Sequence, residues 1–176
     1  MSLNLLHTAG SHQGIFDAIR DRIAPETPLR HHVREDWLRR AQDGAEQALA
    51  DEIAETVGRA EGPVICTCTT IGPLAEAAGA IRVDRPMMQA AARAGGPVLL
   101  VYCLDSTRGP SLDLLDRALA AESRGETIHP LRLAQHWTLL EAGEAGAFDA
   151  AIAGEVRQAA QRMTTLGCVG LEQVSM

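Results

Sequence analysis

The 176-residue chain contains no lysine, because all sixteen of its basic residues are arginine. A Schiff-base lysine and the lysine of a phosphate-binding P-loop are therefore excluded. The glycine fingerprint GxGxxG is also absent, which argues against a nucleotide site. No apolar run approaches the roughly 20 residues that a membrane-spanning helix needs. With a net charge of -7, the chain lacks the basic excess that a nucleic-acid or anionic membrane partner requires.

The cysteines and the amino terminus indicate the compartment. The apolar part of MSLNLLHTAG is too short for a signal peptide. Four cysteines without such a signal are typical of free thiols in a reducing environment, so we expect a cytoplasmic protein. The hydrophobic content of 46% and charged content of 22% are ordinary for a globular chain that buries one core, shared between two small lobes.

Strands and helices alternate along the chain, which is typical of parallel α/β units. The sequence predicts strands at 3–8, 28–35, 62–68, 81–84, 96–104, 126–133 and 168–176. The helices predicted between them include a long one from Trp37 to about residue 60 and one that begins at Leu112 after a turn. Pro130 predicts an edge position for its strand. We therefore expect an α/β fold of two flavodoxin-like lobes with parallel sheets, residues 1–94 and 95–176.

Ligands bind beyond the carboxyl ends of the strands in such sheets. Small hydroxyl residues stand at four of the predicted ends, and one end also carries a thiol. The four ends read His7-Thr8-Ala9-Gly10-Ser11, Cys68-Thr69-Thr70, Asp105-Ser106-Thr107 and Gln173-Val174-Ser175. Hydroxyls and backbone N–H groups at a helix start bind carboxylates or phosphates. Because a nucleotide fingerprint is missing, a small carboxylate ligand fits better.

Cys68 precedes a predicted helix start, where the helix dipole favours a thiolate. It is therefore a candidate base or nucleophile, and a buried structural cysteine is an equally good interpretation from the residues alone. Cys66 and Cys103 lie inside apolar strands and are expected in the core. Cys168 opens its strand at the amino end, on the order of 15 Å from the other end, so a structural role is expected.

A metal site is the second interpretation of the C-x-C pair. Zinc sites usually combine paired cysteines or nearby histidines. The adjacent His31 and His32 point to opposite faces of a strand and do not ligate one ion easily. No metal site is therefore predicted. His12 is either a ligand for an anion or, more simply, a surface residue at a helix start.

Four segments, VICTCTTIGPL, RVDRPM, LLVYCLDSTRGPS and LEQVSM, together resemble the aspartate/glutamate/hydantoin racemase superfamily, and most closely its Asp/Glu racemase-like branch. The likeness runs from HTAGSH to the last residue. It implies two similar α/β lobes with an active site between them. One cysteine from each lobe then works on opposite faces of a substrate's Cα, without a cofactor. The resemblance also implies a homodimer or a higher homo-oligomer.

The resemblance implies roles for individual residues. The family's first cysteine falls on Cys68. Substrate binding falls on Thr8, Thr69, Thr70, Ser106, Thr107, Gln173 and Ser175. The second catalytic cysteine is replaced by Gln173, whose amide is neither a thiolate nor a useful general base. Because family members continue past the last strand, the second lobe is expected to be truncated at its carboxyl end.

These observations predict a cofactor-independent isomerase or racemase-like protein that acts on a small amino or carboxylic acid, with Cys68 as its thiolate. Two-base racemisation needs a second proton donor on the opposite face of the substrate. With one thiol, a decarboxylase or a cis–trans isomerase is an open alternative. A catalytically inactive binding protein for a small carboxylate metabolite is another.

Overall fold

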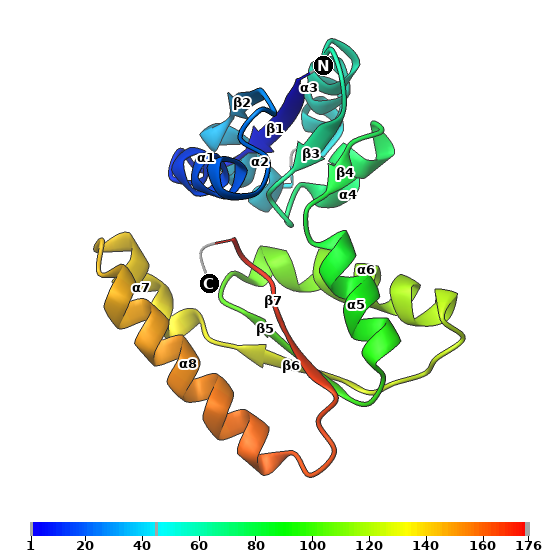
Figure 1. Cartoon of the computed structure of the whole chain (residues 1–176), viewed down its shortest axis with the longest axis vertical. Coiled ribbons are helices and arrows are strands. Elements are labelled where there is room, and N and C mark those ends of the chain that lie inside the picture. The colour runs from blue at the N-terminus through cyan, green and yellow to red at the C-terminus, as the bar shows by residue number, and fades with distance from the viewer. Residues whose placement is uncertain (1, 45, 175–176) are drawn as a thin grey trace. The chain divides into compact units, whose positions relative to one another are not determined.

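The structure, a computed structural model, describes residues 2–44 and 46–174. It contains two parallel sheets with helices packed against them, so the chain has the α/β fold that the sequence predicts (Figure 1). The chain divides after Asp84 into two compact units. The expected boundary after residue 94 falls instead at the end of α5 (Arg85–Ala94). This helix belongs to the second unit because its buried Met88 and Ala92 pack into that unit's core.

The first unit has a four-stranded sheet with the flavodoxin-like strand order. Its elements are β1 (Leu3–His7), α1 (His12–Ile23), β2 (Leu29–Val33), α2 (Glu35–Gln42), α3 (Glu46–Gly58), β3 (Val64–Cys66), α4 (Gly72–Ala77) and β4 (Ile81–Arg82). The strands run parallel in the order β2-β1-β3-β4. The direction in which the sheet grows reverses between β1 and β3, and open α/β sheets bind ligands at such a reversal.

The long helix predicted from Trp37 to about residue 60 is wrong. Gly44 has a φ of +81° and separates α2 from α3. A glycine adopts this left-handed conformation without the steric penalty that other residues meet. The break allows both short helices to lie on the same face of the sheet.

The two faces of the first sheet differ in what covers them. Helices α2, α3 and α4 cover one face over a core in which Trp37, Leu49, Ile53 and Ile71 are fully buried. Burying each such side chain contributes about 1.5–3 kcal/mol. The other face carries α1, which has no buried residue of its own. Apolar burial therefore comes mainly from the α2–α4 face, and the α1 face has room for polar groups.

The second unit has a three-stranded parallel sheet in the order β6-β5-β7. After α5, its elements are β5 (Val98–Tyr102), α6 (Asp105–Ala121), β6 (Ile128–Arg132), the 3-10 turn η1 (Ala134–His136), α7 (Trp137–Glu141), α8 (Ala145–Arg162) and β7 (Cys168–Leu171). All five residues of the central strand β5 are buried. Figure 1 shows α5 and α6 on one face of this sheet and α8 on the other, and two separate core clusters match these faces.

Two proline positions in the second unit test the sequence predictions. Pro130 lies in β6, which pairs with β5 alone among the described strands, so the predicted edge position is confirmed. The turn predicted before Leu112 is wrong, because α6 begins at Asp105 and contains Pro110. A proline inside a helix removes one backbone hydrogen bond, which the rest of this long helix tolerates. Within the described residues, the helices are all too short or too polar to cross a membrane.

Candidate functional site

The exits of β1 and β3 lie side by side, because these parallel strands pair with Leu6 opposite Cys66. The pairing continues beyond the strands, where the N–H of Thr67 donates to the carbonyl of Leu6 at 2.9 Å. This is the point of reversed strand order, where a ligand is expected. The first unit therefore brings four of the predicted site residues to one edge of its sheet, namely Thr8, Cys68, Thr69 and Thr70.

Cys68 and Cys66 differ in their surroundings. Cys68 lies at the exit of β3 with 9% of its surface exposed, and it borders the core of the α2–α4 face. The thiol of Cys66 donates a hydrogen bond to the carbonyl of Cys68 at 3.4 Å. Burial, followed by the neighbouring Cys68 thiol, raises the pKa of Cys66. Cys66 is therefore a protonated core residue, and Cys68 is the thiol that lies at the end of β3, at the border of that core.

A buried ion pair supports the loop that carries Cys68. The Nε and Nη2 atoms of Arg82 donate to the two carboxylate oxygens of Asp84 at 3.0 and 2.6 Å, and both residues are more than 90% buried. The guanidinium lies directly against Gly72, where an added Cβ would come within 2.8 Å of Nε. Buried ion pairs are tolerated when the geometry is bidentate, as here. Gly72 thus allows α4 to begin directly against the ion pair, next to the loop that carries Cys68.

A histidine cluster that the sequence pattern does not predict lies on the α1 face of the same edge. The ring of His7 is fully buried, and its Nδ1 lies 2.8 Å from the hydroxyl oxygen of Thr67. Its Nε2 lies 2.8 Å from Nδ1 of His31, and the two rings are stacked. Nε2 of His31 lies 3.3 Å from the carboxylate of Asp17 on α1. Nδ1 of His12 approaches the same Thr67 hydroxyl at 3.4 Å.

The two-residue period of the strands explains this grouping. Leu5 pairs with His31, so His31 shares a face with His7. His32 lies on the other face, where its Nε2 donates to Oδ1 of Asn4 at 3.1 Å. The prediction that His31 and His32 point to opposite faces is confirmed. The signal that could have revealed the cluster is a pair of histidines at same-face positions of two neighbouring strands.

The rings of His7 and His12 are neutral at pH 7. Burial, followed by the charges of His31, His12 and His32, lowers the pKa of His7 to about 4. Burial also lowers the pKa of His12. A neutral imidazole has one N–H donor and one acceptor nitrogen, so each ring can take a proton on one side and give one on the other.

In the second unit, the side chain of Gln173 occupies the equivalent strand exit, at the ends of β5 and β7. Gln173 follows β7, and its Oε1 accepts hydrogen bonds from the N–H groups of Cys103 and Leu104 at 2.6 and 3.4 Å. These N–H groups stand just beyond β5, so the amide of Gln173 bridges β5 and β7 past the end of their ladder. The thiol of Cys103 is buried, and burial raises its pKa to about 11.

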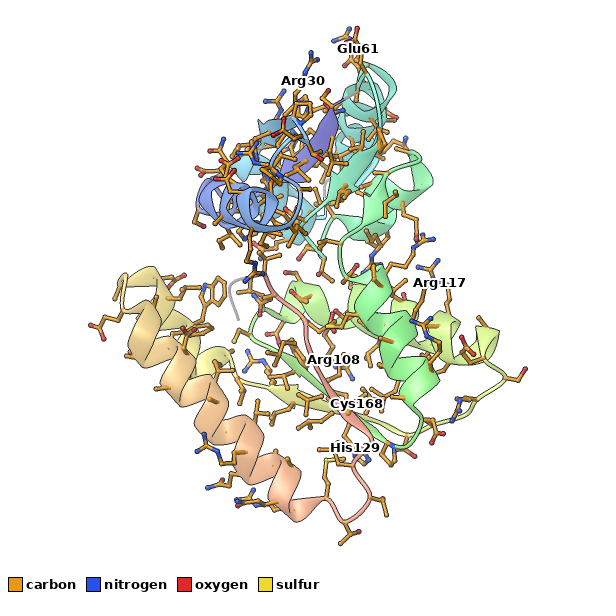
Figure 2. All side chains as sticks on the ribbon, in the orientation of Figure 1. Arg30, Glu61, Arg108, Arg117, His129 and Cys168 are labelled. Atoms are coloured by element: carbon orange, nitrogen blue, oxygen red, sulfur yellow. The ribbon has the colours of Figure 1, made fainter. Side chains whose placement is uncertain are left out.

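The other predicted residues of the second unit have different surroundings. Ser106 and Thr107 lie in the first turn of α6, where Ser106 is partly exposed and Thr107 is 2% exposed. Ser175 lies outside the described residues. Cys168, labelled in Figure 2, stands at the amino end of β7 and so at the opposite end of its strand from Gln173, as predicted.

The first unit also has an open cavity of about 360 Å³ that does not include the strand-exit hydroxyls or Cys68. Its lining comes from β1, β2, α2 and α3 on the face opposite α1. The cationic side chains there have acidic neighbours, as in the pair of Arg59 with Glu55 at 2.6 Å. The cavity is therefore separate from the site at the β1 and β3 exits.

In the described part of the chain, no three His, Cys, Asp or Glu side chains are grouped in a way that could hold a metal ion. No protein-family model, curated protein sequence or solved structure matches the chain.

Proposed function

We propose that the protein is a cofactor-independent isomerase, similar to racemases, that acts on a small amino or carboxylic acid. Cys68 is its thiolate base or nucleophile. The observation that carries the proposal is the position of Cys68, whose side chain is buried, with 9% exposed, at the β1 and β3 exits. Open α/β sheets bind ligands at this reversal of strand order.

The hydroxyl groups around Cys68 support a carboxylate ligand. Thr8, Thr69 and Thr70 stand at the same edge, and hydroxyl side chains are groups that bind carboxylates. In the second unit, Ser106 is partly exposed and remains a proposed substrate ligand. Thr107 is 2% exposed, which fits a structural role better. The predicted role of Ser175 remains a proposal.

The simplest reaction for a single thiol is proton exchange at the substrate's Cα. The thiolate of Cys68 removes that proton, which leaves a carbanion on the substrate and a neutral thiol on the protein. Return of the proton from the same thiol restores the starting enantiomer, whereas inversion needs a donor on the opposite face. Gln173 is not that donor, because an amide does not exchange protons usefully and its Oε1 is bonded to the N–H of Cys103.

The test is incubation of the protein with a panel of amino acids and dicarboxylic acids in deuterated water. We expect deuterium at Cα of at least one panel member with the wild type and with Cys168→Ala, and none with Cys68→Ala. Cys168 is the matched control because it is the partly exposed free thiol of the second unit. No exchange with any member, together with a Cys68 thiol that iodoacetamide leaves unmodified near neutral pH, would overturn the proposal.

A second candidate function is a catalytically inactive binding protein for a small carboxylate metabolite. The position that carries the second cysteine in the racemase superfamily is Gln173 here, and its side chain is committed to the backbone of Cys103 and Leu104. Thermal-shift screening with the same panel separates the two candidates. Stabilisation without deuterium exchange, unchanged in Cys68→Ala, supports binding alone, and exchange that depends on Cys68 excludes it.

Both candidates involve a small-molecule partner in a cytoplasmic protein, and neither calls for a cofactor. The net charge of -7 disfavours nucleic acid as a partner. A homodimer or higher homo-oligomer is also proposed. Light scattering of the purified protein tests it, and a mass equal to one chain of 18.8 kDa would contradict it.

A further inference from the structure

We propose that His12 is a second acid–base catalytic residue of the first unit, and that Thr67, His7, His31 and Asp17 form a proton relay that connects His12 with the protein surface. The inference deepens the proposed function, because it supplies the proton donor that Gln173 does not. It rests on that function only for the identity of the substrate. The relay itself follows from the contacts within the first unit.

The relay is a continuous chain of polar contacts from one element to the next. It begins at Oδ1 of Asp17 on α1, which lies 3.3 Å from Nε2 of His31 on β2. Nδ1 of His31 lies 2.8 Å from Nε2 of His7 on β1. Nδ1 of His7 lies 2.8 Å from Oγ1 of Thr67 after β3. The same oxygen lies 3.4 Å from Nδ1 of His12 at the start of α1.

The side chains of the relay become more exposed from His7 to His31 and from His31 to Asp17. His7 is fully buried, the side chain of His31 is 13% exposed and that of Asp17 is 45% exposed. Buried polar groups are costly unless every donor and acceptor is satisfied. Two apolar side chains in place of His7 and His31 would pack against Phe16 of α1 and would need no hydrogen-bond partners. Two hydrogen-bonded imidazoles at this buried position favour a role in chemistry over a role in packing.

The hydrogen-bond contacts of the relay are compatible with two protonation states. In the first, His31 is doubly protonated and donates to both Asp17 and Nε2 of His7. His7 then carries its proton on Nδ1 and donates to Thr67. The Thr67 hydroxyl donates to the carbonyl of Leu6, which lies at 3.0 Å.

The second state has one proton fewer and the same heavy-atom positions. His31 keeps the proton on Nε2 that faces Asp17, so its Nδ1 becomes an acceptor. His7 therefore carries its proton on Nε2 and donates to His31. The Thr67 hydroxyl turns from the carbonyl of Leu6 to Nδ1 of His7. His7 is neutral in both states, and only its tautomer changes.

A proton delivered to a substrate converts the first state into the second. His12 gives the proton on its Nε2 to the substrate carbanion and receives the Thr67 hydroxyl proton on Nδ1. Thr67 receives the Nδ1 proton of His7, and His7 receives the Nδ1 proton of His31 on its Nε2. The substrate gains one proton, His31 loses one, and every other group ends with the number it had. The reverse movement starts when Nε2 of His12 takes up a proton from solvent or from the opposite enantiomer of the substrate, and it returns His31 and the tautomers of His7 and His12 to the first state.

The relay and Cys68 approach the strand exit from opposite sides. Thr67 and Cys68 are consecutive, so their side chains leave an extended chain on opposite faces of the sheet. Cys68 borders the core of the α2–α4 face, whereas Thr67 contacts His7 and His12 on the α1 face. A substrate at this edge meets a thiol on one side and an imidazole on the other. Two-base isomerisation requires this arrangement.

Other charged groups surround the relay and also influence how it depends on pH. Besides the relay members, they are His32 and Arg30 on β2, Arg34 between β2 and α2, Arg20 and Asp21 on α1, and Glu35 on α2. Arg20 donates to the carboxylate of Asp17 at 3.3 Å, so Asp17 has a cationic partner when His31 is neutral.

The first test needs no substrate. Long-range proton–nitrogen NMR of the ¹⁵N-labelled full chain, from about pH 5 to about pH 9, reports the tautomer of each imidazole around the ordinary histidine pKa. We expect His7 to change from the Nδ1–H to the Nε2–H tautomer over the same pH interval in which His31 loses a proton. A single His7 tautomer throughout the titration of His31 overturns the relay.

The second test uses stereochemistry in deuterated water. His12→Asn should retain deuterium exchange that Cys68 catalyses on one enantiomer, but it should lower the rate of inversion by about 100-fold or more. Thr67→Val should lower inversion similarly, and Thr67→Ser should restore it. His129→Gln and Thr56→Val are matched controls, since the Thr56 hydroxyl only donates to the Glu52 carbonyl of its own helix. Inversion within twofold of wild type in a folded His12→Asn overturns the role of His12.

The two tests separate failure of the relay from failure of the proposed function. If no panel member exchanges deuterium but the His7 tautomer switches with His31, the proposed reaction is wrong and the relay is supported. If exchange depends on Cys68 but the tautomer does not switch, the relay is wrong and the proposed reaction is supported.

Discussion

Oε1 of Gln173 accepts a hydrogen bond from the backbone N–H of Cys103 at 2.6 Å, and this contact joins the exits of β5 and β7. The first unit joins its corresponding strands, β1 and β3, through Nδ1 of His7 and the hydroxyl of Thr67 at 2.8 Å. Both bridges occupy the same topological position, because both sheets begin with the strand order second-first-third. The imidazole and hydroxyl of the first unit can exchange protons, whereas the amide of the second unit cannot.

Replacing Gln173 should destabilise the second unit. Gln173→Ala removes the oxygen that accepts from Cys103 and Leu104 and leaves those N–H groups unsatisfied, which costs about 1–3 kcal/mol. Urea unfolding measures the loss. The exposed Gln158 accepts only from Arg162 on its own helix, so Gln158→Ala should stay within about 0.5 kcal/mol of wild type. Equal effects of the two substitutions would show that the Gln173 bridge is not structural.

A methyl group at Gly72 should disrupt the support of the Cys68 loop. The new Cβ would lie 2.8 Å from Nε of Arg82 in a site closed by the ion pair with Asp84, so Gly72→Ala should cost about 1–3 kcal/mol. Gly14 of α1 has no heavy atom within 4 Å of the equivalent position, and Gly14→Ala should stabilise by about 0.5–1 kcal/mol. Thermal or urea unfolding gives both values, and a neutral Gly72→Ala would contradict the packing described.

The stability of the first unit should fall in acid through His7. Its pKa is lowered from 6.5 to about 4 in the folded state. Between these values the unfolded chain binds a proton that the folded chain does not, so stability rises with pH in that window and falls as the pH drops through it. From about pH 7 to about pH 4 the loss through His7 should be on the order of 2 kcal/mol.

Unfolding in urea at several pH values measures this dependence. The slope of stability against pH between about pH 4 and about pH 6.5 should be smaller in His7→Gln than in wild type. It should be unchanged in His129→Gln, which alters an exposed histidine of the second unit. The same slope in all three proteins would show that His7 is not held neutral.

The four free cysteines should differ in their reaction with iodoacetamide near pH 7. Burial raises the pKa of Cys66 and Cys103, so both should react only on unfolding. Burial also raises the pKa of the partly exposed Cys168, which should react slowly. Cys68 should react fastest, and a carboxylate ligand should protect it. Mass spectrometry locates the label, and labelling of Cys168 before Cys68 would contradict the assignment.

The sequence predicts most of the fold because its strands are short apolar runs separated by clear turn and helix signals. Pro130 correctly places β6 at an edge, since a proline cannot donate to a second neighbour. The two wrong helix predictions lie where neighbouring residues favour different local structures. Gly44 breaks a helix that the apolar stripe continues through, and the first turns of α6 form despite Pro110. Packing against the sheet decides both, and the spacing of residues along the chain does not contain that information.

The candidate site is only partly readable from the sequence. The exits of β1 and β3 can be identified as neighbours, because the position of Cys68 and Thr8 follows from strand order alone. The histidine relay could not be found in this way. It needs the register between β1 and β2, which brings His31 beside His7, and the angle of α1, which brings His12 and Asp17 to the same face.

The most direct measurement of the central claim is the initial rate of Cα deuteration by the wild type, Cys68→Ala and Cys168→Ala, with the best substrate of the panel. We expect equal rates for the wild type and Cys168→Ala, and a loss of at least about 100-fold in Cys68→Ala. A Cys68→Ala protein that folds and deuterates its substrate at the wild-type rate would contradict it.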